Sequence, residues 1–401
     1  MNPIKQFYCR VFQVAFRAAL PVLPYRNPVL RHDIAEVAAV FAQTGKHHPL
    51  IVTDTALHRL GLTQKLEDTL QQAGIPYTLY DGVAQNPTTR MVEEALAQYH
   101  TNGCDSLIAF GGGSPMDCAK AVGARVVYPN KPLGKMAGII RVWKKLPPLI
   151  AIPTTAGTGS ETTLAAVIVD AETRHKYVIN SFPLIPAYAV LDASVIHSLP
   201  CSVAAATGMD ALTHAVEAYI GRSTTKATRA DAIQAVQLVF THLEAAAHHT
   251  DTEAEAKMLL ASHLAGRAFT RSYVGYVHAV SHSLSGQYDM PHGLTNAILL
   301  PIVLELYGPA AHKKLAQLAL AVGLGQRGEP NDLLAERFIE AVYALNQRLG
   351  IPNHIDGIRE EDIDKLAAYA DKEANPLYPV PVLWDKEQLK VIYRKAGNHG
   401  R

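Results

Sequence analysis

Short apolar runs alternate with amphipathic segments along the first half of the chain. The apolar runs predict strands at 49–54, at 76–83, within 105–114 and at the start of 148–161. Helical periodicity appears between them, at 56–73, at 88–100 and from about Ser114 onward. Strands that alternate with helices predict a mainly parallel sheet with helices on both faces.

The pattern changes at about residues 195–200. Alanine-rich segments follow, and we see no convincing strand beyond about residue 200; the main helical segments are 202–220, 227–248, 253–270 and 310–322. We therefore predict an α/β domain over residues 1–197, which includes an N-terminal extension, and an all-helical domain over residues 198–401.

The N-terminal extension is basic. It carries Lys5, Arg10, Arg17 and Arg26, with no acidic residue before Asp33. Arg10 and Arg17 interrupt the apolar core that a signal peptide needs. Two interpretations stay open. We favour a packing extension of the first domain, and the alternative is an amphipathic helix that lies on a membrane surface.

Composition narrows the class of partner. The chain has 37 basic and 36 acidic side chains, a net charge of +1, so its overall field does not attract nucleic acid or anionic lipid. This balance favours a small-molecule partner. The four cysteines form no CxxC pair, which indicates neither a zinc knuckle nor a disulfide scaffold but reduced thiols in a cytoplasmic protein. No uncharged apolar run approaches the ~20 residues that span a bilayer.

Two glycine-rich loops follow predicted strands. "GGGSPMD" (111–117) lies where a strand ends and a helix begins, and "TTAGTGSE" (154–161) follows the next strand. Glycines let the backbone approach a phosphate closely, and a helix N-terminus favours an anion. Asp54 ends another strand, where an acid can accept hydrogen bonds from a ribose. We therefore predict a Rossmann-like dinucleotide site, with a plain strand-to-helix turn and a helix N-cap at Asp54 as the alternatives.

Histidines cluster in the second half. His278 and His282 are four residues apart and share one face of a helix, and His292 follows in a Pro-His-Gly turn. Asp210 and His214 have the same spacing on another predicted helix. No Lys or Arg occurs between Ser272 and His312, so nothing in that stretch repels a cation. One carboxylate and several imidazoles on facing helices predict a divalent-metal site.

These motifs resemble those of the iron-containing (group III) alcohol dehydrogenases. The resemblance runs from about residue 49 to 305 and rests on "GGGSPMDCAK", "PTTAGTGSE", "GMDALTHAVEAY" and "VHAVSHSLSGQYDMPHGLTNAILLP". It implies that the metal ligands are Asp210, His214, His278 and His292. It also implies that His282 lies near the nicotinamide as a catalytic residue in the proton path. The implied dinucleotide contacts are Asp54, Asn86, Gly112, Gly113, Ser114, Asp117, Thr154, Thr155, Thr158 and Lys176.

The resemblance implies hydride transfer between NAD and a small alcohol, or its aldehyde or ketone, with the alcohol oxygen on the metal. Fe²⁺ is the family's usual metal, and Zn²⁺ accepts the same ligands. A carboxylate at Asp54 favours NAD over NADP, because it repels a 2′-phosphate. We also expect a homo-oligomer, a dimer or larger. The sequence departs from the family pattern at two places that bear on substrate choice and subunit contacts. Residues 27–38, "NPVLRHDIAEVA", replace a glycine-rich turn, and Leu377 replaces the arginine that commonly follows Asn375-Pro376.

Two other functions remain open at this point. A lyase that resembles dehydroquinate synthase also combines NAD, a metal and two domains, but its anionic substrate requires basic residues that the stretch 272–312 lacks. A non-enzymatic metal- or nucleotide-binding module is the other.

Overall fold

The computed structural model describes residues 1–397, which form two compact units. One unit is Pro24–Ser198, and the other combines Met1–Leu23 with the chain from Leu199 onward. This corrects the expected assignment of residues 1–197 to a single domain, because the N-terminal extension belongs to the helical unit.

The first unit contains alternating strands and helices. Its strands are β1 (Val29–Arg31), β2 (Pro49–Asp54), β3 (Thr78–Val83), β4 (Ser106–Gly111), β5 (Gly138–Ile139), β6 (Leu149–Pro153), β7 (Ala165–Val169), β8 (Lys176–Asn180) and β9 (Tyr188–Val190). Its helices are α2 (Val37–Thr44), α3 (Thr55–Arg59), α4 (Gln64–Gln72), α5 (Thr89–Thr101) and α6 (Gly113–Val127). The single helix predicted at 56–73 is thus two helices, and Gly61 between them has a φ of +72°, which ends the first.

Six strands form one parallel sheet in the order β1-β9-β6-β4-β2-β3. Three of the internal strands, β2, β4 and β6, are buried along almost their whole length, as their continuous apolar runs require. This confirms the predicted parallel α/β fold. The sequence did not predict the smaller sheet β5-β8-β7, in which β7 and β8 pair antiparallel. Those strands bury only alternate residues, which gives a weaker apolar signal.

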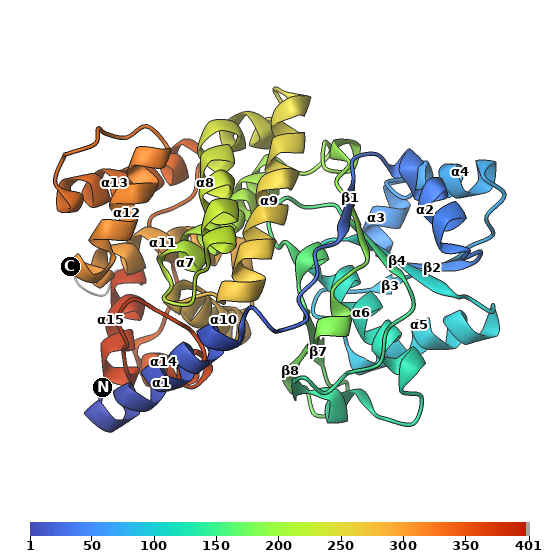
Figure 1. The fold of residues 1–401 in the computed structure, drawn as a ribbon, viewed down its shortest axis with the longest axis horizontal. Coiled ribbons are helices and arrows are strands. Elements are labelled where there is room, and N and C mark those ends of the chain that lie inside the picture. The colour runs from blue at the N-terminus through green and yellow to red at the C-terminus, as the bar shows by residue number, and fades with distance from the viewer. Residues whose placement is uncertain (398–401) are drawn as a thin grey trace. The chain divides into compact units, whose positions relative to one another are not determined.

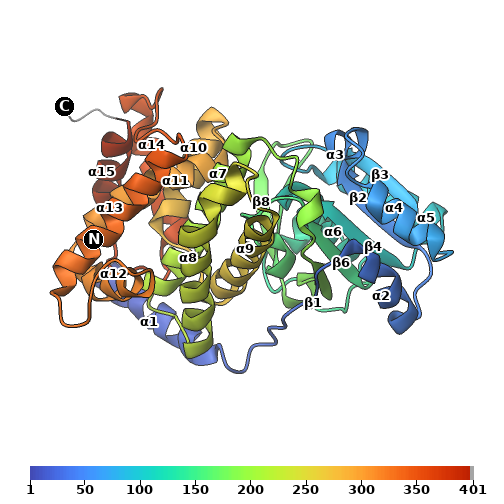
Figure 2. The same ribbon diagram turned by 90° about the horizontal axis from the view of Figure 1, so that it is seen from above.

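The second unit is helical. It comprises α1 (Pro3–Ala19), α7 (Cys201–Ile220), α8 (Lys226–Ala247), α9 (Thr252–Ser272), α10 (Tyr276–Tyr288), α11 (His292–Tyr307), α12 (Pro309–Ala321), α13 (Asn331–Arg348), α14 (Glu360–Ala374) and α15 (Lys386–Ala396). Helices α7, α8 and α9 pack side by side (Figures 1 and 2). Within the described residues the last strand ends at Val190, which confirms the prediction of no strand after about residue 200.

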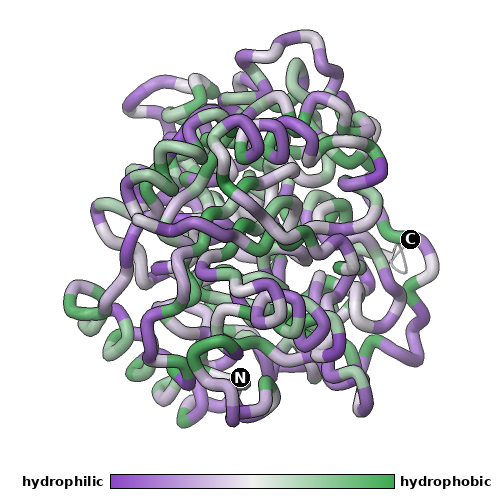
Figure 3. The backbone as a smooth tube through the Cα atoms, turned by 90° about the vertical axis from the view of Figure 1, so that its right-hand side faces the viewer, coloured by the Kyte–Doolittle hydropathy of each residue, from purple (hydrophilic) through white to green (hydrophobic). Residues whose placement is uncertain are grey.

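Helix α1 is fixed to this unit by its polar side chains. Arg10 donates to the carbonyl oxygens of Val380 and Pro381, at 2.8 and 2.9 Å, and Gln13 donates to those of Pro376 and Tyr378. These bonds explain why the extension belongs to the helical unit. Hydrophobic residues occur in short stretches throughout the chain (Figure 3), and across residues 1–397 no helix has the length and apolar character needed to cross a bilayer.

Candidate active site

The strand order of the parallel sheet creates a topological switch point. Strands β2 and β4 are neighbours, and the chain continues outward from them on opposite sides, to β3 beyond β2 and to β6 beyond β4. Ligands of such sheets bind beside the carboxyl ends of the strands at this point. Asp54 and Gly111 are the last residues of β2 and β4, and Pro153 ends the adjacent β6. Asp54 and the starts of both glycine-rich loops, which were predicted to bind the cofactor, therefore lie at this edge of the sheet.

The first glycine-rich loop leads from β4 into α6. Gly111 has a φ of +149°, which an L side chain rarely adopts, and a Cβ there would lie 2.5 Å from a carbon of Pro115. Gly112 is the N-cap of α6, and no side chain caps this helix. The helix therefore presents its first backbone N–H groups and the positive end of its dipole at the switch point.

The second loop lies against the first. A Cβ on Gly112 would be 3.5 Å from Thr155 Oγ1, and one on Gly113 would be 3.7 Å from Thr158 Cγ2. The backbone N–H of Thr154 donates to the carbonyl of Gly111 at 3.2 Å. Thr155 Oγ1 is buried and has no hydrogen-bond partner within residues 1–397. A buried hydroxyl without a partner is costly, so this atom fits a site that takes a polar ligand.

Lys120 joins the two loops. It is buried on α6, and its Nζ lies 2.8 Å from the carbonyl oxygen of Ser160, 2.7 Å from Thr163 Oγ1 and 2.9 Å from the carbonyl oxygen of Ala165. Burial lowers the pKa of Lys120 to about 8, although Asp117 acts in the opposite direction. The helix that begins at the first loop is thus tied to the residues that end the second.

The remaining predicted cofactor residues have structural partners. Asp54 Oδ1 accepts from the N–H of Leu57 at 2.9 Å, so the expected helix N-cap is present. Asn86 accepts from Lys176 Nζ at 2.9 Å, which brings these two residues together. Asp117 Oδ2 accepts from the N–H of Val167, and burial raises the pKa of Asp117 to about 6.

The four predicted metal ligands converge in the helical unit. Asp210 and His214 come from α7, His278 from α10, and His292 is the first residue of α11. Asp210 Oδ1 lies 3.7 Å from Nε2 of both His278 and His292, and Asp210 Oδ2 lies 3.9 Å from His214 Nδ1. The ring of His214 stacks between those of Phe269 and His278, at centroid distances of 4.2 and 4.4 Å.

A carboxylate that the sequence analysis did not single out orients His278. Glu217 Oε2 lies 2.6 Å from His278 Nδ1, and its two oxygens also accept from the N–H groups of Gly275 and Val277, each at 2.8 Å. Burial lowers the pKa of His278 well below its usual value, which keeps the ring neutral. Burial also raises the pKa of Glu217, and the hydrogen bonds from Gly275, Val277 and His278 oppose that effect by stabilising the carboxylate. His278 therefore directs Nε2 toward Asp210 as a neutral imidazole, the form that binds metals.

A second residue that was not singled out, Asn296 on α11, lies among the ligand atoms. Its Nδ2 is 2.7 Å from Asp210 Oδ1, 3.2 Å from His278 Nε2 and 3.0 Å from His292 Nε2. Its Oδ1 is buried without a partner in the described part of the chain. Rotation of the amide exchanges these two atoms and brings a carbonyl oxygen toward the ligands. The orphaned oxygen and the carboxylate–imidazole donor set both fit a divalent cation.

His282 lies beside the ligands but contacts a different carboxylate. Its ring stacks on His292 at 5.0 Å between centroids, and its Nδ1 is 2.7 Å from Glu373 Oε1. Burial raises the pKa of Glu373, but His282 and the hydroxyl of Tyr378 outweigh that effect and lower it. Glu373 is thus an anion that fixes Nδ1 of His282 as a donor.

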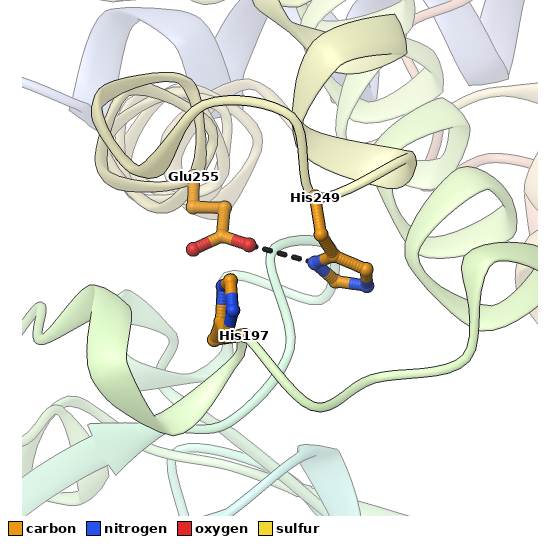
Figure 4. Close-up of side chains that lie close together, drawn as sticks. All are labelled: His197, His249 and Glu255. Atoms are coloured by element: carbon orange, nitrogen blue, oxygen red, sulfur yellow. Dashed lines mark hydrogen bonds and ion pairs between the residues drawn. The ribbon is translucent and has the colours of Figure 1, made fainter.

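Another carboxylate–imidazole pair, between the buried Glu255 and the partly exposed His249, lies elsewhere in the helical unit. His249 Nδ1 lies 2.7 Å from Glu255 Oε1 (Figure 4), and its Nε2 lies 2.6 Å from the carbonyl oxygen of Leu199. The hydrogen bonds to Glu255 and Leu199 raise the pKa of His249. The pair joins the turn after α8 to α9.

Helical spacing could have indicated two of the missed residues. Glu217 is seven residues after Asp210, and Asn296 is four residues after His292, so each shares a helix face with a ligand. Glu373 gave no such signal, because 91 residues separate it from His282.

Two family models match the chain. The model described as iron-containing alcohol dehydrogenase matches residues 29–193, and the model of the C-terminal part of the Fe-containing alcohol dehydrogenase family matches residues 204–397. The chain belongs to the iron-containing alcohol dehydrogenase family. It is an oxidoreductase that acts on alcohols, as predicted, and the lyase interpretation is not favoured.

Known members of the family match most of this chain. A 1,3-propanediol dehydrogenase of Klebsiella pneumoniae is 38% identical over 357 residues, which is 88% of this chain and 92% of the relative. A lactaldehyde reductase of Escherichia coli K12 is 39% identical over 332 residues, 81% of this chain and 86% of the relative. The structure of a sulfoacetaldehyde reductase from Bifidobacterium kashiwanohense in complex with NAD⁺ has a TM-score of 0.82 at 28% identity and covers 93% of this chain and 98% of that one.

Proposed function

We propose that the chain is a metal-dependent dehydrogenase that transfers a hydride between NAD and a short-chain alcohol, or its aldehyde or ketone. The convergence of Asp210, His214, His278 and His292 carries this proposal. The relatives named for 1,3-propanediol and lactaldehyde support a short substrate that can carry a second hydroxyl group. We further propose a cytoplasmic homo-oligomer of two or more copies.

Fe²⁺ is the proposed metal, with Zn²⁺ as the alternative, because one carboxylate and three imidazoles accept both. The bound ion supplies Lewis acidity toward the alcohol oxygen. Asp210 compensates part of the positive charge, and Glu217 holds His278 in the tautomer that presents Nε2. Because burial keeps His278 neutral, ligation needs no proton release from that ring at neutral pH.

NAD is the proposed dinucleotide, and its nicotinamide supplies the hydride acceptor. The backbone of Gly112, Gly113 and Ser114 would hold the pyrophosphate at the N-terminus of α6. The partnerless hydroxyl of Thr155 would donate to a cofactor oxygen. The other contacts of this proposed site are Asp54, Asn86, Asp117, Thr154, Thr158 and Lys176. The NAD⁺ complex of the related sulfoacetaldehyde reductase supports this cofactor.

His282 is the proposed proton relay. Its Nδ1 donates to Glu373, so a proton would be exchanged at Nε2. The adjacent anion stabilises the imidazolium that forms when the ring accepts the alcohol proton.

The experiment uses the purified chain after metal removal and reconstitution with Fe²⁺ or Zn²⁺. NADH consumption is followed with short aldehydes, hydroxyaldehydes and ketones. We expect turnover only after metal is added, and faster turnover with NADH than with NADPH. His278→Ala and His292→Ala should each lose most bound metal and activity but keep the helical circular dichroism spectrum. Full metal occupancy in both variants would remove these residues from the site.

A further inference from the structure

The outer face of α1 is apolar, although this helix lies on the surface. Its exposed side chains include Ile4, Phe7, Tyr8, Val11 and Val14, which are 79, 72, 58, 49 and 68% exposed. Their spacing of three, four or seven residues places them in one stripe along the 17-residue helix. Val22, 82% exposed, follows just beyond the helix. Single exposed apolar residues are normal on a protein surface, but a stripe of this length marks an interaction site.

Three polar side chains of α1, those of Lys5, Arg10 and Gln13, bond to the rest of the unit and keep the apolar stripe on the outer face. Gln13 is 3% exposed and Arg10 is half-buried, and together they donate to four backbone carbonyls between Pro376 and Pro381. Lys5 binds both carboxylate oxygens of Asp371, at 2.9 and 2.8 Å. Rotation of α1 to bury its apolar face would break these bonds. The outward orientation is therefore built into the fold.

Cations gather beside the C-terminal end of the stripe. Arg17 is exposed and donates to the carbonyl of the exposed Arg222 at 3.4 Å. Burial, together with the charges of Arg229, Arg17 and Arg222, lowers the pKa of Lys314 to about 8, so each of these arginines repels the Lys314 ammonium group. At the other end, Asp371 is neutralised by Lys5. The surface beside the C-terminal end of the stripe thus carries a local excess of positive charge, although the net charge of the whole chain is only +1.

The first family model begins at residue 29, so α1 lies outside the residues that the two models match. We propose that the stripe of Ile4, Phe7, Tyr8, Val11, Val14 and Val22 docks the enzyme on a membrane surface that contains anionic lipid. Apolar side chains enter the acyl boundary, the Tyr8 ring suits the headgroup level, and Arg17 and Arg222 contact headgroups.

A second copy of the chain is the less suitable occupant. A stable protein interface takes about 20–30 residues from each side. The stripe offers six large side chains, and charged groups border it. Two copies paired with their α1 helices parallel would also bring their arginine clusters close together, whereas anionic headgroups neutralise these clusters.

The test is flotation of the purified full-length enzyme with lipid vesicles. We expect more enzyme to bind vesicles of phosphatidylcholine with phosphatidylglycerol than vesicles of phosphatidylcholine alone, and binding should fall as salt rises. The triple variant Phe7→Ser/Val11→Ser/Val14→Ser should bind the anionic vesicles at least about tenfold less than the unmodified enzyme, since each substitution removes apolar area that would enter the membrane. Arg17→Glu should reduce binding to the anionic vesicles only. Leu60→Ser/Trp143→Ser, which changes side chains that are 73 and 69% exposed elsewhere, should bind like the unmodified enzyme.

Absence of binding to anionic vesicles would overturn the proposal, as would equal binding by the triple variant. If the triple variant instead dissociates an oligomer in analytical ultracentrifugation, with no vesicle binding by the unmodified enzyme, the occupant is a second copy. Turnover with soluble aldehyde should be the same in all these variants, which separates this test from that of the proposed function.

Discussion

Glu217 Oε2 lies 2.6 Å from His278 Nδ1, and both side chains are buried. The carboxylate is also held by two backbone N–H groups at the start of α10, so it cannot turn away from the ring. The position of His278 is therefore set by α7, the helix that carries Asp210 and His214, as well as by α10. Glu217 thus fixes the position of His278 relative to the two proposed ligands on α7.

Glu217→Gln should weaken metal binding by about 10–100-fold while the protein stays folded. The amide is a weaker acceptor than the carboxylate, and its NH₂ group can donate to Nδ1, which favours the tautomer that cannot ligate through Nε2. Metal affinity is measured by competition with a chelator. Asp81→Asn, which alters the carboxylate–imidazole pair with His58 in the other unit, is the control and should keep its affinity. Equal affinities in the two variants would show that Glu217 has no role at the metal.

His282→Ala should retain its metal and lose turnover by about 10²–10⁴-fold, the usual contribution of a positioned acid–base group. Glu373→Gln should retain more activity. Loss of the anion destabilises the imidazolium, so the limb of the pH–rate profile that belongs to His282 should shift to lower pH. The checks are metal analysis and kinetics across pH. If His282→Ala loses metal in parallel with activity, the residue helps to hold the metal site and does not act as the proton relay.

Asp54 has two roles that variants can separate. Asp54→Ser keeps a side chain that can cap α3 and removes the charge, whereas Asp54→Gly weakens the cap and removes the charge. Both should narrow or reverse the preference for NAD over NADP, because neither repels a 2′-phosphate. Thermal melting should show the larger stability loss in Asp54→Gly. Equal use of both dinucleotides by the unmodified enzyme would contradict the assignment.

Asp192 should contribute stability that acid removes. It is buried after β9, where it accepts from Lys65 Nζ at 2.6 Å and from the N–H of Ile34 at 2.9 Å. Burial raises the pKa of Asp192, but these bonds and those from Ser194 outweigh it and lower the pKa below 3.8. The contribution is therefore complete above about pH 4 and is lost as the pH falls through the lower, folded-state pKa.

Asp192→Asn should cost about 1–3 kcal/mol at neutral pH. The difference from the unmodified protein should shrink when the pH falls below about 4, since the unmodified side chain then becomes protonated. Urea unfolding at several pH values measures both effects. A difference that does not depend on pH would show that the charge of Asp192 contributes nothing.

Periodic patterns predicted most of the fold, and their failures have physical causes. Continuous apolar runs identified β2, β4 and β6, because both faces of these strands are buried. The β7–β8 hairpin buries only every second residue and was missed. The extension was assigned to the wrong unit, because its partners near Tyr378 are more than 360 residues away in the sequence.

The candidate site was predicted to a similar degree. Helical spacing indicated Asp210, His214 and His278 as candidate metal ligands, and the structure places these side chains together. Spacing gave no indication of Glu373, since its contact with His282 depends on how α14 packs against α10. The cap formed by Asp54 was expected only as an alternative, yet it occurs, and it leaves the role toward a ribose as a proposal.

The bonds of Lys120 have a consequence for how tightly a dinucleotide binds. A flexible loop loses conformational entropy when it closes on a ligand, and that loss is subtracted from the affinity. Here the ammonium group holds the chain between Ser160 and Ala165 to the helix that begins at Gly113, so this ordering is already complete when the protein folds. The conformational entropy that this unit loses when the dinucleotide binds should therefore be small, and little of the binding enthalpy is cancelled by it. Substitution of Lys120 should move part of that ordering from the folding step to the binding step.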